Sequence, residues 1–230
     1  MNMKKEIRER GTRGFTLIEM LVSVAIFTTV MVIALGALLS LSEADRKAEV
    51  LNSAINNLSF GMEGMSRSLR TGHSYHCGIS GTASDPQDCG ASTNYPYTSA
   101  QSYIAFMVTD GSVSGCVAGN NCTVSYCLGS TKTNSCSVGV SGTKCDTANG
   151  YTCSILRSVN GGSLLPLTAA DISITNLGFY VIGSLRKSAT GGDSVQPKVT
   201  ILMSASIPIT PTQSSSFNLQ TSVVQRLYDL

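Results

Sequence analysis

One segment carries most of the structural information in this 230-residue chain. It begins with Arg13-Gly14-Phe15-Thr16-Leu17-Ile18-Glu19-Met20 and continues through an uncharged apolar run to Leu41. The 22 residues from Met20 to Leu41 would form a helix of about 33 Å, long enough to cross the hydrocarbon core of a bilayer. The sequence therefore predicts one membrane-spanning helix over residues 15–41, with the carboxylate of Glu19 near its start.

A short basic leader precedes this helix. Residues 1–14 carry five basic and two acidic side chains, namely Lys4, Lys5, Arg8, Arg10 and Arg13 against Glu6 and Glu9. An ordinary secretory signal would have a shorter apolar stretch, with a cleavage site of small residues after it. Because positive charge is retained on the cytoplasmic side, we expect a single-pass protein of the cytoplasmic (inner) membrane whose leader is cytoplasmic and whose remainder is exported.

The order of basic leader, Gly14, Phe15 and apolar helix with Glu19 near its start resembles the class III signal of type IV pilins and pseudopilins. The resemblance implies that prepilin peptidase cleaves between Gly14 and Phe15 and methylates the new amine of Phe15. It also implies four partners: other pilins or pseudopilins along the N-terminal helix, the prepilin peptidase, an inner-membrane assembly platform and membrane lipid. The motif covers only the N-terminal part of the chain.

Glu19 is the one charged residue between Phe15 and Leu41. An ionised group inside a membrane costs several kcal/mol unless it is paired, which makes an intramembrane acid a functional candidate. The resemblance implies that Glu19 of an incoming subunit neutralises the free amine of Phe15 on a neighbour and so sets the axial register. Within one chain, the helix macrodipole already favours a carboxylate near the helix start. The alternative is that the carboxylate merely reaches the membrane interface.

The helical pattern continues over residues 42–71. Apolar residues recur at steps of three and four, the stripe of an amphipathic helix: Ala44, Ala48, Leu51, Ile55, Leu58, Met62, Met65 and Leu69. Glu43–Lys47 and Glu63–Arg67 have the spacing of favourable ion pairs on a helix, and Gly72 is the expected C-terminal stop. The stripe could form a coiled coil, but packing on a following sheet of the same chain is favoured.

Two glycines interrupt this part of the pattern. Gly61 and Gly64 each cost up to about 1 kcal/mol relative to alanine inside a helix. They would permit close approach of the exported head or mark a soft segment, and the sequence leaves both interpretations open.

Residues 72–230 are expected to form the exported globular head, in which residues 77–153 are rich in Cys, Gly and Ser. This region contains all the cysteines: Cys77, Cys89, Cys116, Cys122, Cys127, Cys136, Cys145 and Cys153. An even number of cysteines in an exported domain predicts disulfides, although eight cysteines allow 105 pairings and the sequence selects none. A zinc site is the rival, but no Cys-x-x-Cys pair occurs.

Strand patterns occur within and after the cysteine-rich region. Short β runs are expected at residues 103–108, 151–159, 177–185, 199–207 and 217–223, with loops at 160–162, 191–193 and 208–216. A long helix followed by several strands predicts an α+β fold, in which an antiparallel sheet packs on the amphipathic half of the helix. Residues 217–226 also resemble, more weakly, the closing strand of some minor pilins and J-type pseudopilins.

Two departures from many major pilins favour a minor pilin or a pseudopilin. The last cysteine is Cys153, so no disulfide can close a loop near the C-terminus. Gly36 occupies the exported half of the apolar helix, where many major pilins have proline. The large size of the head points the same way.

No enzyme motif and no cofactor site is recognisable. The exported part has no H-E-x-x-H, phosphate-loop or G-x-S-x-G pattern. His73 and His76 could hold a metal by their spacing, but as loop residues they are expected to be exposed bystanders. Asp146, Asp171 and Asp193 stand singly, whereas calcium needs six to eight oxygen ligands, so no calcium site is predicted.

Charge also bears on the function class. Without the leader, 11 basic residues face 12 acidic ones and no basic run remains, which does not favour nucleic-acid binding. We therefore expect a non-enzymatic structural subunit of a type IV pilus or a type II secretion pseudopilus. The alternatives are a tip-displayed adhesive pilin whose cystine-rich loops bind a surface, a DNA-uptake pseudopilin, and a monomeric anchored protein with a coincidental pilin-like start.

Overall fold

A computed structural model describes residues 14–89, 100–109, 111, 113–136, 140–185, 195–210 and 213–226. The basic leader up to Arg13 and the predicted loop at 191–193 lie outside the described residues. The chain divides into two compact units, Met1–Glu49 and Val50–Leu230. Each unit is described by itself below.

The longest element is helix α1, Leu17–Thr71, which contributes to both units. Thr16 caps its start: the Thr16 Oγ1 atom accepts from the Glu19 amide at 3.3 Å, and the Thr16 carbonyl accepts from the Met20 amide at 3.3 Å. The helix ends at Gly72, as predicted, where a Cβ atom would stand 2.5 Å from the Phe106 ring. Glycine is therefore needed there for close approach.

In the first unit, every side chain of the apolar segment up to Leu41 is exposed. Three of its hydroxyl groups bond within the helix: Ser23 donates to the Glu19 carbonyl at 2.7 Å, and Thr28 and Thr29 donate to carbonyls one turn earlier. These bonds leave no polar hydrogen of these three side chains in need of water. Among the described residues, α1 is the one helix long and apolar enough to cross a membrane.

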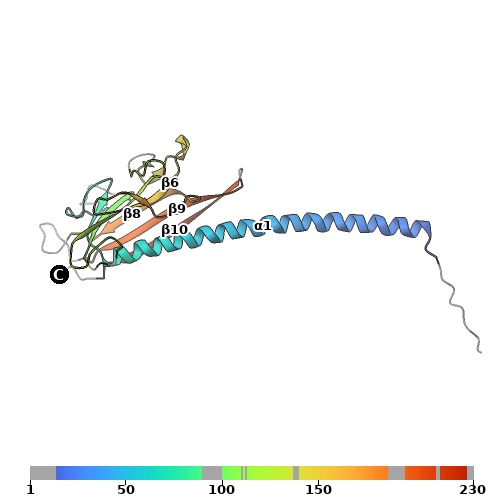
Figure 1. Cartoon of the computed structure of the whole chain (residues 1–230), viewed down its shortest axis with the longest axis horizontal. Coiled ribbons are helices and arrows are strands. Elements are labelled where there is room, and N and C mark those ends of the chain that lie inside the picture. Colours follow the sequence, from blue (N-terminus) through green and yellow to red (C-terminus); the bar gives the residue numbers. More distant parts are fainter. Residues whose placement is uncertain are drawn as a thin grey trace, which may run out of the picture. The chain divides into compact units, whose positions relative to one another are not determined.

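The second unit joins the end of α1 to two antiparallel sheets (Figure 1). The first sheet has the order β1 (His73–Gly78), β2 (Tyr103–Val108), β3 (Cys122–Ser130), β6 (Cys153–Val159), β7 (Leu165–Pro166). The second has the order β10 (Gln213–Val224), β9 (Lys198–Thr210), β8 (Ser173–Ile182), β5 (Lys144–Cys145), β4 (Val140–Ser141). A short 3-10 helix, Thr147–Asn149, follows β5. The predicted α+β fold is confirmed.

The core lies between the last turns of α1 and the inner faces of the sheets. Val199, Ile201, Met203, Ala205 and Ile207 of β9 are all buried, as their alternation predicts. They share one apolar cluster with the buried face of the helix, which consists of Ala54, Leu58, Met62, Met65 and Leu69. Within this unit the stripe therefore packs on the sheets, as favoured over a coiled coil.

The helix stripe differs from the prediction at Ala44, Ala48 and Ile55, which are exposed. Ile55 was expected to be buried, but 43% of its surface is exposed, while Ala54 is only 2% exposed. Ala54 lies four residues, about one helical turn, before the fully buried Leu58, so the two residues share the buried face of the helix. Of the two interpretations left open for Gly64, close approach of the head is not supported by the described residues, none of which places an atom within 4 Å of the Cβ position. At Gly61 the nearest atom is at an ordinary 3.9 Å.

All eight cysteines form disulfides, which confirms the predicted framework. The pairs are Cys77–Cys89, Cys116–Cys122, Cys127–Cys136 and Cys145–Cys153, with sequence separations of 12, 6, 9 and 8 residues. Each bridge is local, and six of the eight cysteines are buried. The bridges therefore belong to the core of the head, rather than stapling an outer layer of loops.

Residues 77–153 are less loop-like than their composition suggests. Besides the predicted β2, this region contains β3, whose nine residues are mostly buried, and the short strands β4 and β5. The β3 sequence mixes Ser, Thr, Gly and Cys with few branched residues, so its β propensity is weak. Pairing with β2 and β6 on both sides gives it the strand conformation.

Candidate functional site

The predicted cleavage and assembly residues lie at the start of α1. Gly14 and Phe15 precede the helix in irregular backbone, and Phe15 is 76% exposed. Apart from the adjacent residues, no described atom lies within 4 Å of the Gly14 Cβ position. A peptide bond outside a helix, without neighbours, is sterically open to a peptidase. Cleavage and methylation at this bond remain predictions.

Glu19 is the third residue of α1 and is exposed. Together with the cap residue it forms the pattern Thr16-x-x-Glu19, the sequence signature of a capping box, which the sequence analysis did not use. The carboxylate is also placed where the positive end of the helix dipole stabilises it. Glu19 makes no ion pair with any described residue. Its carboxylate is thus oriented near the helix start and open to a cation from outside the chain.

The helix around Glu19 presents a continuous apolar surface. Large side chains from Phe15 to Leu41 are 46–79% exposed. An apolar surface of this extent marks contact with lipid or with other apolar helices. The arrangement therefore suits a helix that exchanges membrane lipid for neighbouring helices of the same kind.

Ion pairs are sparse along the rest of the helix. The predicted Glu63–Arg67 pair forms at 3.1 Å, whereas Glu43 and Lys47 do not come within ion-pair distance. Both members of the Glu63–Arg67 pair are largely exposed, so the pair adds less than about 1 kcal/mol to stability.

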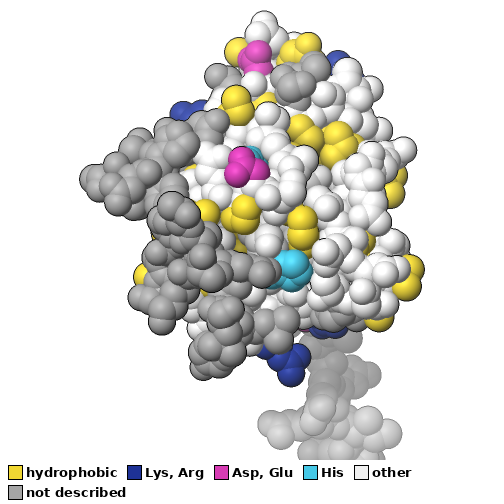
Figure 2. Space-filling view, turned by 90° about the vertical axis from the view of Figure 1, so that its left-hand side faces the viewer, with side chains coloured by type: hydrophobic (Ala, Val, Ile, Leu, Met, Phe, Trp, Pro, Cys, Tyr) yellow, Lys and Arg dark blue, Asp and Glu magenta, His cyan; other side chains and the backbone are white. Residues whose placement is uncertain are grey.

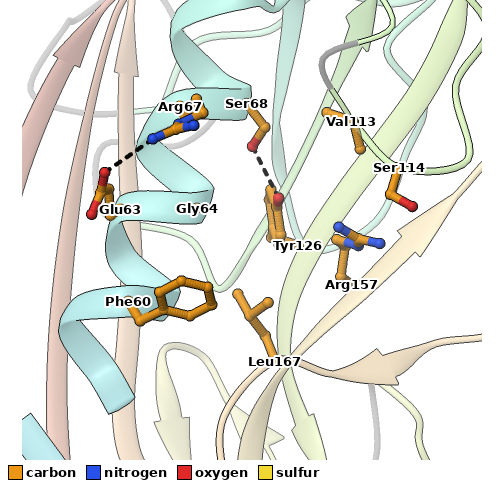
Figure 3. Close-up of a pocket in the computed structure, with 10 residues that line it drawn as sticks. All are labelled: Phe60, Glu63, Gly64, Arg67, Ser68, Val113, Ser114, Tyr126, Arg157 and Leu167. Atoms are coloured by element: carbon orange, nitrogen blue, oxygen red, sulfur yellow. Dashed lines mark hydrogen bonds and ion pairs between the residues drawn. The ribbon is translucent and has the colours of Figure 1, made fainter. Parts of the chain in front are cut away.

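A cleft of about 280 Å³ opens on the head, between the last turns of α1 and the first sheet (Figure 3). The helix side of the cleft is formed by three residues that follow one another at intervals of one turn, Phe60, Gly64 and Ser68. Tyr126 of β3 and its cross-strand neighbour Arg157 of β6 form the sheet side. The remaining lining residues are Glu63, Arg67, Val113, Ser114 and Leu167.

Tyr126 lines this cleft and contacts both the helix and the first sheet. Its hydroxyl lies 2.9 Å from the Ser68 Oγ atom, which itself donates to the Met65 carbonyl. Burial raises the pKa of Tyr126 above its usual value of 10.0, against the smaller lowering effects of the Ser68 hydrogen bond and the nearby Arg157 guanidinium. The Tyr126 ring also stacks on Phe106 at a centroid distance of 5.9 Å.

His76 is not the exposed bystander that was predicted. It lies in β1, is 5% exposed, and its Nδ1 and Nε2 atoms face the carbonyl oxygens of Asp85 and Ser80 at 2.6 and 3.0 Å. The ring fills the inside of the loop closed by the Cys77–Cys89 bridge, and a Cβ atom on Gly81 would overlap it. His76 therefore holds a loop and is not available as a metal ligand.

The described residues include no group of three or more His, Cys, Asp or Glu side chains that could hold a metal ion. On the face of the molecule shown in Figure 2, the acidic, basic and histidine side chains are few and scattered. Asp146 instead caps the 3-10 helix, accepting from the Asn149 amide, while Asp193 lies outside the described residues. The absence of an enzymatic function stays a prediction.

Comparison with known proteins agrees with the N-terminal segment. Residues 10–35 match the family described as the prokaryotic N-terminal methylation motif. No curated protein and no solved structure matches the chain. The family match covers the segment that contains Gly14, Phe15 and Glu19, and it does not extend to the head. The chain thus carries a prokaryotic N-terminal methylation motif over residues 10–35, which supports a type IV pilin-like precursor.

Proposed function

We propose that this chain is a minor pilin or a pseudopilin, a non-enzymatic structural subunit of a type IV pilus or a type II secretion pseudopilus. The observation that supports it is the methylation motif at residues 10–35, on a helix whose apolar segment is exposed throughout. Cys153 as the last cysteine and Gly36 in the apolar segment support the minor or pseudopilin assignment.

In this proposal the subunit is held in the inner membrane by residues 15–41 before assembly, with the leader in the cytoplasm. Four disulfides in the head support its export, because such bonds persist in oxidising compartments. Prepilin peptidase removes residues 1–14 and methylates Phe15. The subunit then leaves the membrane as its apolar helix packs against the helices of other subunits.

Glu19 pairs in this assembly with the free amine of Phe15 on a neighbouring subunit. In a medium without water, an unpaired carboxylate is costly and a paired one is tolerated, so the contact selects a single axial register. The cap supplied by Thr16 holds the first turn of the helix and thereby orients the carboxylate.

The test separates pairing from capping. Glu19→Ala is expected to leave cleavage after Gly14 and methylation of Phe15 intact by mass spectrometry, and to abolish recovery of the subunit in the sheared-fibre fraction. Thr16→Ala is the matched control, because it removes the cap, at about 0.5–2 kcal/mol, but keeps the carboxylate. Equal defects in the two variants would show that Glu19 acts only as part of the helix cap.

A second experiment distinguishes the two kinds of fibre. Deletion of the gene is expected either to block secretion of folded exoproteins while surface fibres persist, or to remove surface fibres while secretion persists. The pilin-like proposal is wrong if the deletion changes neither secretion nor surface fibres and the protein isolated from the unmodified strain still begins with Met1.

A further inference from the structure

The cleft beside Phe60 contains features that the fold of one chain does not explain. Phe60 is 81% exposed, and it lies off the buried stripe formed by Leu58 and Met62. An aromatic side chain of this exposure is costly in water and is typical of the centre of an interface. Packing within the head therefore gives no reason for an aromatic residue at position 60.

Gly64, one turn after Phe60, is a second such feature. Its Cβ position has no described atom within 4 Å, so alanine would fit and would favour the helix by up to about 1 kcal/mol. A glycine that lines a cleft without being needed for the fold leaves space for something that enters the cleft.

The sheet side of the cleft supplies positive charge. Arg157 is half-buried beside Tyr126 and makes no ion pair with any carboxylate in the described part of the chain. Arg67 is already paired with Glu63. The cleft is thus a half-apolar groove with one unneutralised guanidinium, which fits a carboxylate carried on a compact helical backbone.

The same chain contains a segment of this chemistry on the first unit. Asp45 and Glu49 are exposed and one turn apart, and neither forms an ion pair among the described residues. Like charges at this spacing destabilise a helix by about 0.2–0.5 kcal/mol, although Arg46 and Lys47 of the same turn offset part of this. Ala44 and Ala48 are exposed beside them and are small enough to let another surface approach closely.

We propose that the cleft between Phe60, Gly64 and Arg157 receives the Asp45–Glu49 turn of α1 from a second copy of this chain. The proposal rests on the proposed function, because copies that assemble side by side through α1 and are displaced along its axis bring the two segments together. Arg157 then lies between the two carboxylates and offsets one of their two negative charges. Phe60 packs over Ala48, and the space at Gly64 admits the helix backbone.

The test uses the full-length chain, assembled in cells, with the photo-crosslinker p-benzoylphenylalanine in place of Phe60. In a mixture of isotopically light and heavy chains, the expected product joins position 60 of one copy to residues 43–49 of another. The same crosslinker at Ile79, which is 66% exposed and does not line the cleft, is the control and should give no such product. A product joined to another protein, to another segment, or to none overturns the proposal.

Charge exchange adds a second, independent measurement. Arg157→Glu should reduce the crosslink at least about tenfold, and so should Asp45→Lys with Glu49→Lys. All three substitutions in one chain should restore it, because each copy then offers the reversed pair. Lys132→Glu, an exposed cation outside the cleft, should change nothing. Failure of the triple variant to restore the crosslink, while its unfolding temperature is normal, counts against the contact.

Volume provides the last comparison. Gly64→Ala should weaken the crosslink several-fold because a methyl group enters the cleft, whereas Gly61→Ala, with the same gain in helix propensity but outside the cleft, should leave it unchanged. Cleavage after Gly14 is read in the same samples. Normal cleavage with no crosslink refutes only this inference, whereas absent cleavage refutes the proposed function.

Discussion

Asp88 offers a quantitative test of how the head is held together. This carboxylate is 3% exposed, and it accepts from the Gly183 amide at 2.9 Å and the Ser184 amide at 2.7 Å. It thereby ties the loop closed by the Cys77–Cys89 bridge to the turn that follows β8, where Gly183 has a φ of 76°. The loop and the turn are far apart in sequence, and beside this contact the backbones of Cys89 and Val181 exchange two hydrogen bonds, at 3.0 and 2.8 Å.

Asp88→Asn keeps one acceptor oxygen and turns the other into a donor that faces a buried amide. The loss of one hydrogen bond to a charged group, with one buried N–H left unpaired, costs about 2 kcal/mol. For a head of this size, that should lower the midpoint of thermal unfolding by about 4–8 °C. Asp88→Ala removes both acceptors and should cost more.

The assay is thermal unfolding of the oxidised full-length chain in detergent, followed by circular dichroism. Asp85→Asn is the matched control, because Asp85 is exposed and its hydrogen bonds in the loop are made by its backbone: the amide donates to the Thr82 carbonyl, and the carbonyl faces His76. If Asp88→Asn and Asp85→Asn unfold at the same temperature, the two amide bonds do not hold the turn and the reasoning fails.

Three further predictions concern the same head. Gly72→Ala should destabilise it by about 1–3 kcal/mol in urea unfolding, because the added Cβ meets the Phe106 ring at 2.5 Å, while Gly61→Ala, whose nearest neighbour is at 3.9 Å, should not. Burial raises the pKa of Tyr126 in the folded chain, so this tyrosine ionises first in the unfolded chain. Tyr126 should therefore leave the free energy of unfolding unchanged below about pH 10 and lower it above that pH. The fall above about pH 10 should be shallower in Tyr126→Phe. An equally steep fall in that variant would contradict this. Replacing Cys77 and Cys89 together by serine should lower the free energy of unfolding by about 3 kcal/mol, and replacing Cys116 and Cys122 by about 2 kcal/mol. The first effect is larger because Cys77 and Cys89 close the longer loop. The reverse order in calorimetry would refute the loop-entropy argument.

Much of the candidate site could be predicted because its signals are local. The basic leader, Gly14, Phe15 and the apolar run with Glu19 are contiguous, and family comparison matched the same stretch. The Thr16-x-x-Glu19 pattern is also visible in the sequence, and the structure forms the bond from the Glu19 amide to the Thr16 side chain. The role of Glu19 between subunits is beyond a single chain and stays a prediction.

His76 and β3 show where local signals fail. His76 looks like a loop residue by its neighbours, but β1 pairs with β2 and the Cys77–Cys89 bridge closes a loop over the imidazole ring. The strand β3 has weak propensity of its own and owes its conformation to partners far away in sequence. Tertiary context outweighs propensity in both cases.

The amino-acid sequence by itself determined the helix, the strand β9 and the presence of disulfides, since a periodic pattern or an even cysteine count reflects backbone geometry and compartment, which need no knowledge of distant neighbours. Only the tertiary structure decided which cysteines pair, that Ala54 rather than Ile55 faces the core, and that Phe60, Gly64 and Arg157 line one cleft. These depend on which surfaces meet once the sheets close on α1, and that choice is made by packing across the whole head.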